Sequence, residues 1–178
     1  IPPVAVVHEL YSMSWTTDIL ALTTALGSAK LLHKGGARME PKYYEDLPVG
    51  ATFTGGSRTI TNDDLATFLS LSGTKNPKFR DRKTAEGTEF GKIICPGVMT
   101  ITLTMGLTDN VFGNEWQSVA LLGFERVSFL KPVTPGDTIC VELEVAAKRE
   151  TKRPDRGHVL FKSFTRNQHG EVVLEMVR

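Results

Sequence analysis

The spacing of hydrophobic residues changes several times along the chain, and each change predicts a different kind of element. Residues 51–60 are predicted to form a first strand after the turn Pro48-Val-Gly50. Thr61-Asn-Asp-Asp64 has the pattern of a capping box, in which a hydroxyl and a carboxylate bond the free N–H groups at a helix start. Apolar residues at helical spacing continue to Gly73, where the helix is predicted to end.

A long run of hydrophobic residues follows a polar and irregular stretch at 74–90. Residues 98–112 contain a single charged side chain, that of Asp109, and would be apolar on almost every face of a helix. A helix of that composition is predicted to be buried on all sides. Pro96-Gly97 marks its start and Gly113 its end.

After Ser118 the hydrophobic and polar residues alternate with a period of two, which is typical of strands with one buried face. Strands are predicted at 119–133, 136–152, 157–166 and 171–178. Short turns join the last three, so these should form an antiparallel meander. The whole order predicts an α+β fold, with a curled antiparallel sheet around the apolar helix. This is the hotdog architecture, although the element order alone also suits other α+β domains.

Residues 1–42 have a different pattern and are interpreted as an N-terminal extension to a domain at 43–178. Between Thr16 and Lys34, leucines and one isoleucine share a broad helical face, and Gly35-Gly36 ends the predicted helix. This helix could bind a partner or a membrane surface, or it could pack on the domain. We favour packing, because the segment lacks the basic face that membrane-surface helices carry.

Composition excludes several classes of function. The formal net charge of +1 at pH 7 gives no overall field that would attract nucleic acid or an anionic membrane. Any affinity for an anion must therefore come from a local cluster. Two cysteines, Cys95 and Cys140, are too few for a disulfide framework and lack metal-ligand spacing. We therefore expect reduced thiols, a cytoplasmic location and no metal site.

Several stretches outside residues 1–42 carry a resemblance to a known family. They lie at 43–46, 72–77, 88–97, 129–138, 148–157 and 167–170. In them the chain resembles the MaoC-like (R)-specific enoyl-CoA hydratases. Ser72-Gly-Thr-Lys-Asn-Pro77 is similar to the family's Ser-Gly-Asp-x-Asn-Pro, and the last two stretches are closest to the mesaconyl- and itaconyl-CoA hydratase branch.

The resemblance implies a hotdog fold that adds water to, or removes it from, an α,β-unsaturated acyl thioester of coenzyme A. It implies no cofactor other than the coenzyme A of the substrate itself. It also implies dimers of hotdogs, with active sites at subunit boundaries. In the family an Asp and a His transfer protons, and a backbone N–H at the start of the buried helix stabilises charge on the thioester oxygen.

Only part of this machinery carries over to the present sequence. Gly97 stands where the family provides the N–H group, although it could also serve a tight turn. The Asp position is Thr74 and the His position is Phe79, and neither side chain exchanges a proton usefully near neutral pH. Asn76 is kept and could shape the loop or bond the thioester. Positioned acid–base catalysis typically contributes about 10²- to 10⁴-fold, so we expect little hydration by this chain alone.

Other residues could replace the lost pair, but each has a simpler interpretation. Carboxylates on the same segment, those of Asp81, Glu86 and Glu89, are expected to be solvated. Cys95 precedes the helix start, where a thiol pKa can fall, yet a cysteine in an apolar run usually belongs to the core. His158 and His169 are expected to be packing and turn residues.

A basic cluster flanks one predicted hairpin turn and comprises Lys148, Arg149, Lys152, Arg153 and Arg156. Guanidinium groups pair with phosphate oxygens, so Lys152, Arg153 and Arg156 could bind the phosphates of coenzyme A. The cluster could equally be a solvated turn.

Three functions therefore stay open. The first is an acyl-CoA-binding member of the hydratase/dehydratase family whose acid–base pair is replaced. The second is a non-catalytic subunit of a heteromeric hydratase, and the third is a hotdog thioesterase, which would need a carboxylate against the buried helix. We expect a homodimer or a heterodimer with another hotdog protein, since exposed sheet edges are normally paired.

Overall fold

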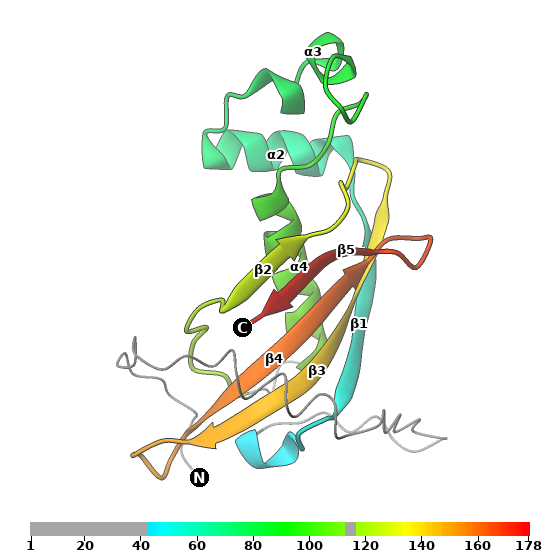
Figure 1. Cartoon of the computed structure of the whole chain (residues 1–178). Coiled ribbons are helices and arrows are strands. Elements are labelled where there is room, and N and C mark those ends of the chain that lie inside the picture. The colour runs from blue at the N-terminus through cyan, green and yellow to red at the C-terminus, as the bar shows by residue number, and fades with distance from the viewer. Residues whose placement is uncertain (1–42, 113–116) are drawn as a thin grey trace.

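The computed structural model describes residues 43–112 and 117–178. Their strands form one antiparallel sheet in the order β1-β3-β4-β5-β2, which curls around a long helix (Figure 1). The strands are β1 Thr52–Thr59, β2 Arg126–Phe129, β3 Thr138–Glu150, β4 Gly157–Arg166 and β5 Val172–Val177. The helices are α2 Asn62–Ser72, α3 Arg82–Glu86 and α4 Gly97–Phe112, with 3-10 turns η1 Tyr44–Asp46 and η2 Pro77–Phe79. This arrangement confirms the predicted α+β hotdog fold.

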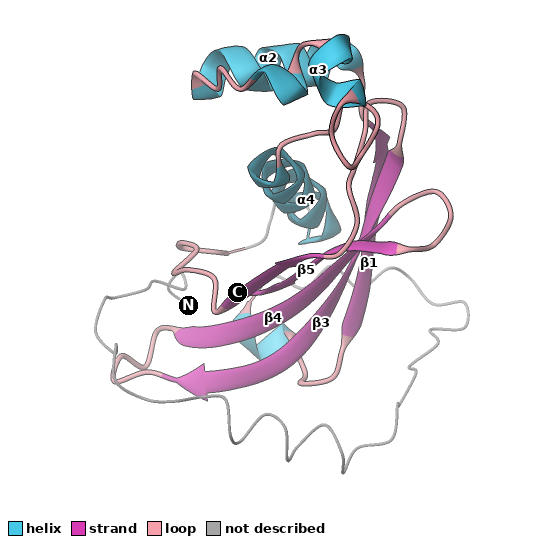
Figure 2. Ribbon diagram, turned by 45° about the horizontal axis from the view of Figure 1, so that its top comes forward, coloured by secondary structure: helices cyan, strands magenta, loops and turns pink. Residues whose placement is uncertain are grey.

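The segment between β1 and α4 forms a separate layer at one end of the sheet (Figure 2). Its first helix, α2, starts as predicted: the Thr61 hydroxyl accepts a hydrogen bond from the Asp64 N–H at 3.0 Å. The Asp64 carboxylate in turn accepts one from the Thr61 N–H at 2.9 Å. Gly73 ends the helix with φ at 66°, a left-handed conformation that glycine adopts without strain.

The sheet and α4 pack face to face in matching register. Along β4, Phe161, Ser163 and Thr165 point toward the helix and are buried. Thr104 of α4 and Thr165 share a hydrogen bond of 2.8 Å between their hydroxyls, and the rings of Phe112 and Phe161 lie 5.6 Å apart. Each turn of α4 is therefore about as long as two residues of β4, so successive inward-facing residues of the strand meet successive turns of the helix.

The prediction that α4 is buried on all sides is wrong for the described chain. Its buried residues recur on one face, from Met99 and Thr104 to Val111. On the opposite face Thr102 is exposed, and the Val98 side chain is 59% exposed. Within the described residues the sheet covers only one side of the helix, and composition alone could not show which side of the helix is covered.

The predicted strand at 119–133 is also wrong in extent, because only Arg126–Phe129 is a strand. The preceding stretch keeps its apolar residues exposed, at 42% for Val119, 48% for Leu121 and 55% for Leu122. β2 is an edge strand, so nothing in the described chain hydrogen-bonds to its outer side. Alternation of hydrophobic and polar residues indicates that one face of a segment is buried. A strand also requires a neighbouring strand to which its backbone can hydrogen-bond.

The predicted extension at 1–42, its helix at 16–34 and the predicted helix stop at Gly113 lie outside the described residues. Within the described ranges, no helix has the length and apolar character that crossing a membrane requires.

Candidate functional site

The start of α4 presents unsatisfied backbone N–H groups. The first N–H groups of any helix lack a carbonyl one turn earlier, and in α4 these belong to Gly97 and Val98. The helix dipole adds a partial positive charge at this end, so an anionic oxygen is stabilised there. The Pro96 carbonyl accepts the Met99 N–H at 2.9 Å, and no backbone carbonyl of the described residues accepts the N–H of Gly97 or Val98.

The absence of a side chain at position 97 matters for packing and not for backbone angles. Gly97 is not among the glycines with positive φ. A Cβ atom built on it would lie 2.7 Å from the ring of Phe129 on β2, closer than atoms can approach. The Phe129 ring therefore lies directly against the N-terminus of α4 and forms an apolar wall beside its N–H groups.

Cys95 is a buried core residue whose surroundings disfavour the thiolate. Its side chain is buried, and its N–H donates to the Val133 carbonyl at 2.7 Å. Burial, helped by the charges of Asp137 and Asp64, raises the pKa of the thiol to about 12. With its pKa at about 12, the thiol is protonated near neutral pH.

The positions of the expected acid–base pair lie between α2 and α3, at the same end of the molecule as Gly97. The Thr74 hydroxyl shares a hydrogen bond of 2.8 Å with the Ser72 hydroxyl. The Phe79 ring packs against the apolar cluster that includes Met99 of α4, and the Lys78 ammonium lies 4.9 Å from the ring centroid. Phe79 thus packs between α4 and the overhanging segment, by which we mean the residues between α2 and α4.

Asn76 has a local structural role. Its side-chain oxygen accepts the Lys78 N–H at 3.2 Å, which caps the η2 turn. The loop is thereby held in the shape that places Phe79 over the core.

The carboxylates on this segment are engaged with their neighbours. Asp81 caps α3 by accepting the Thr84 N–H at 2.7 Å, and the hydrogen bonds from Thr84 hold the pKa of Asp81 below its ordinary value. Glu86 pairs with Arg82 at 2.8 Å on the same helix. Glu89 is exposed. None of these contacts directs one of these three carboxylates toward α4, whereas Asp63 and Asp64 of α2 line a pocket together with Met99 and Thr102 of α4.

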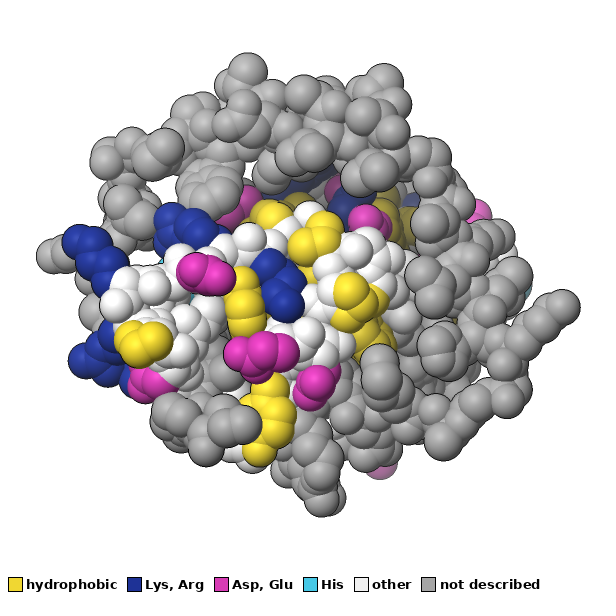
Figure 3. All heavy atoms as spheres, turned by 90° about the horizontal axis from the view of Figure 1, so that it is seen from below, with side chains coloured by type: hydrophobic (Ala, Val, Ile, Leu, Met, Phe, Trp, Pro, Cys, Tyr) yellow, Lys and Arg dark blue, Asp and Glu magenta, His cyan; other side chains and the backbone are white. Residues whose placement is uncertain are grey.

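The basic hairpin lies at the opposite end of the sheet from Gly97, where β3 turns into β4 (Figure 1). Lys152 and Arg153 are exposed, and cationic side chains gather on the left of the face seen in Figure 3. Arg156 forms two hydrogen bonds with Asp155, at 2.9 and 2.6 Å, so its charge is already paired. One chain therefore does not bring these three residues to Gly97.

The packing of side chains at this end of the sheet was not predicted from the sequence. The Tyr44 ring covers Gly157 so closely that a Cβ there would lie 2.3 Å from a ring carbon. The Lys148 ammonium lies 4.0 Å from the centroid of the same ring and donates to the Tyr44 carbonyl at 2.5 Å. His158 packs beside Arg149, and burial followed by that positive charge holds the pKa of His158 below its ordinary value. The sequence features that could have indicated this contact are the aromatic residue Tyr44 and Gly157 at the start of a predicted strand.

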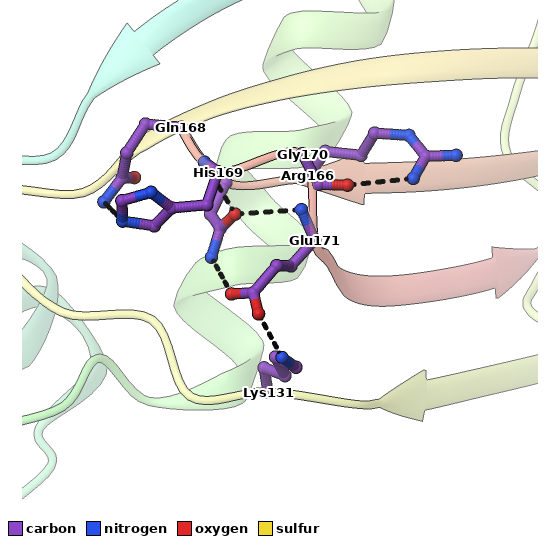
Figure 4. A network of polar contacts seen from close by, with 7 residues as sticks. Lys131, Arg166, Gln168, His169, Gly170 and Glu171 are labelled. Atoms are coloured by element: carbon purple, nitrogen blue, oxygen red, sulfur yellow. Dashed lines mark hydrogen bonds and ion pairs between the residues drawn. The ribbon is translucent and has the colours of Figure 1, made fainter.

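The turn between β4 and β5 is fixed by a polar network (Figure 4). The Asn167 side-chain oxygen accepts the N–H groups of His169 and Glu171, each at 3.0 Å, and the Glu171 carboxylate pairs with Lys131. Gln168 connects this turn to the one before β3 by donating to Asp137 at 2.9 Å. The network explains His169 as a turn residue, in line with its sequence interpretation. Among the described side chains, no three potential metal ligands lie together.

Comparison with known proteins identifies relatives over most of the described chain. The profile of the MaoC like domain family matches residues 47–165. Protein MaoC of Klebsiella aerogenes is 33% identical over 65% of this chain, and the mesaconyl-CoA hydratase of Cereibacter sphaeroides is 28% identical over 77%. A solved Archaeoglobus protein described as a monoamine oxidase regulatory protein superposes with a TM-score of 0.73 and 33% identity, covering 79% of this chain and 93% of its own.

The chain is shorter than the two curated relatives. The matched region spans 33% of MaoC and 40% of the mesaconyl-CoA hydratase. The similarity thus concerns less than half of each of those proteins.

Proposed function

This chain belongs to the MaoC-like domain family, and from that premise we propose that it binds an acyl thioester of coenzyme A with the thioester oxygen at the start of α4. The acyl group would be α,β-unsaturated or 3-hydroxylated, because these are the substrate and product of a hydratase. The observation that carries the proposal is the open N–H end of α4 against the Phe129 ring. Such an end can bind a polarised oxygen whatever the neighbouring side chains are.

The proposal separates binding from turnover. Thr74 and Phe79 occupy the positions of the proton-transferring pair, and neither Cys95 nor the loop carboxylates replace them. We therefore infer that the reaction associated with this site is hydration or dehydration of the acyl group. We also infer that this chain alone catalyses that reaction poorly.

A non-catalytic subunit of a heteromeric hydratase is the second candidate, and the packing of Phe79 favours it. The ring fills a place in the apolar cluster next to α4 and so contributes to a stable core. A chain of this kind would bind thioester or complete the site of an active hotdog partner.

We also propose that the chain forms dimers, either with itself or with another hotdog protein. The outer side of β2 and the exposed apolar residues at 119–124 provide an edge that a second sheet would cover. A cytoplasmic location suits the protein, since Cys95 and Cys140 are both free thiols.

The test of the thioester site compares two substitutions of which one keeps and the other removes the backbone N–H at position 97. In a Phe129→Ala background, which removes the clash, Gly97→Ala keeps the backbone N–H and Gly97→Pro removes it. Proline is tolerated in the first turn of a helix, so both variants should fold. We expect crotonyl-CoA to bind the proline variant about fivefold more weakly, as a lost hydrogen bond of about 1 kcal/mol requires. Equal affinities, measured by calorimetry, would contradict the proposal.

A further inference from the structure

The side of α4 that faces away from the sheet is open within the described residues, and it borders a pocket between α2 and α4 (Figure 2). We propose that the N-terminal segment 16–34 docks on this side of α4 as an amphipathic helix. The proposal concerns an interaction surface, goes beyond the proposed function and does not depend on the binding of a thioester.

The residues on this side of α4, which we call the open face, recur at helical spacing. Val98, Thr102 and Gly106 are exposed, each four residues after the one before, and Met105 beside them is half-buried. A Cβ atom built on Gly106 would meet no other atom within 4 Å. Asp109 follows at the end and is also exposed. The open face is therefore uncharged for about two turns and acidic at its end.

The pocket between α2 and α4 widens this apolar surface. Its lining includes apolar side chains from both helices, namely Phe68, Leu71, Met99 and Leu103. Thr102 belongs both to the pocket and to the open face, so the two surfaces are continuous. The Leu71 side chain is 87% exposed. Contiguous exposed apolar surface of this kind marks a place where another segment packs.

The sequence at 16–34, which lies outside the described residues, contains a stripe that matches the open face. Four apolar residues recur at intervals of three and four and would share one side of a helix: Ile19, Leu22, Leu26 and Ala29. From Ile19 to Ala29 a helix advances about 15 Å, and from Val98 to Asp109 it advances about 16 Å. The two stripes therefore agree in length and in apolar character.

The position of the first described residue sets the direction in which the segment docks. Tyr43 precedes η1, which lies at the end of the molecule where α4 stops (Figure 1). Leu47, just after η1, is buried in the apolar cluster that contains Val111 of α4. Residues 35–42 join the segment to Tyr43, and eight extended residues span about 26 Å. The segment therefore ends near the end of α4, because the reverse direction would require this linker to run along α4 as well.

Charges at the end of the open face agree with this direction. Lys30 and Lys34 lie one helical turn apart at the end of the segment, and Asp109 is the exposed charge at the end of the open face. Asp18 lies at the other end, near the start of α4, where the helix dipole favours a negative charge. Exposed ion pairs contribute at most about 1 kcal/mol, so the apolar stripe supplies most of the affinity.

A cysteine on the open face reports whether the segment covers it. The reporter chain carries Thr102→Cys and Cys140→Ser, and its remaining cysteine, Cys95, is buried. We expect its thiol to react with a maleimide at least about tenfold more slowly than that of a Lys75→Cys/Cys140→Ser chain, because labelling requires the segment to move away. Position 75 is exposed in the structure. The full-length chain is used throughout, and mass spectrometry follows the rates.

Two pairs of substitutions in the reporter chain distinguish the apolar stripe from the other side of the segment. Ile19→Asp/Leu26→Asp places charges in the stripe, and labelling should become at least about tenfold faster because buried charges are costly. Thr17→Asp/Thr24→Asp adds the same two charges at the same spacing on the opposite side of the predicted helix, and labelling should stay slow.

The second cysteine shows whether each variant is folded. Cys95 should stay unlabelled in every variant, since it is buried in the core. If it reacts in the first pair, Ile19→Ser/Leu26→Ser takes the place of that pair, because serine weakens the stripe without adding charge.

Three outcomes would overturn the proposal. Labelling of the reporter chain as fast as that of the Lys75→Cys chain would show that the open face is uncovered. Equal rates in the two charge variants would show that the apolar stripe does not cover it. Protection that both variants keep, and that increases with protein concentration, would show that a second copy of the chain covers α4 instead.

Discussion

The start of α4 and the overhanging segment between α2 and α4 lie at the same end of the molecule, yet they differ in what their chemistry depends on. At the helix start the proposed active group is a backbone N–H, beside which the Phe129 ring packs on a residue without a Cβ. On the overhanging segment the active groups of the proposed site would be side chains, and the resemblance implies that Thr74 and Phe79 stand in their place. A site made of backbone survives substitution more readily than one made of side chains, so binding and turnover can separate within one fold.

The strongest way to break this comparison is to restore the pair with Thr74→Asp and Phe79→His. If the helix start still binds substrate, the hydration rate of crotonyl-CoA should rise about 100-fold, at the lower end of what positioned acid–base groups contribute. The gain stays low because the Phe79 ring is packed in the core, and an imidazole there must also reach the substrate. The rate is followed through the absorbance of the conjugated thioester.

A matched control carries Thr74→Asn and Phe79→Leu, which change the same positions without adding a proton-transfer group. This control should stay at the rate of the unmodified chain. Rapid hydration by the unmodified chain would show that another residue performs the chemistry and that the two positions were assigned wrongly.

A second experiment sharpens the contrast between the two replaced positions. Phe79→Ala should lower the free energy of unfolding by about 2 kcal/mol, because the half-buried ring leaves a gap beside α4. Thr74→Ala should cost less than about 0.5 kcal/mol, since it removes only an exposed hydrogen bond to Ser72. Urea unfolding of the two variants measures both values. Equal costs would mean that Phe79 does not belong to the core.

Sequence patterns predicted the parts of the fold that depend on neighbours in the chain. The capping box at Thr61 and Asp64 and the stop at Gly73 were confirmed residue by residue, because their contacts span three residues or fewer. The alternating pattern also predicted the meander of β3, β4 and β5 correctly. Gly97 was singled out by family resemblance, but its reason, the Phe129 ring, comes from a residue far along the chain.

Features that depend on three-dimensional arrangement were not predictable. The length of β2 was overestimated because the exposed residues at 119–124 have no strand beside them in one chain. Arg156 was grouped with the free cations, whereas Asp155 neutralises it. The distance between Gly97 and the hairpin follows from strand register, which the pattern of one strand does not contain.

The last prediction concerns Asn76, which was expected from the sequence either to shape the loop or to bond the thioester, and which in the structure caps a turn. Its oxygen caps η2 through the Lys78 N–H. Asn76→Ala should therefore lower the free energy of unfolding by about 1 kcal/mol, the usual cost of a lost cap. Asn76→Asp keeps an oxygen acceptor at the same place and should preserve stability, as measured by thermal unfolding. Because Asn76 acts as a cap and not as a ligand-binding residue in this account, crotonyl-CoA should bind the aspartate variant as it binds the unmodified chain. A loss of affinity in that variant at full stability would mean that the amide N–H of Asn76 bonds the ligand, and the overhanging segment would then retain one polar group of the site.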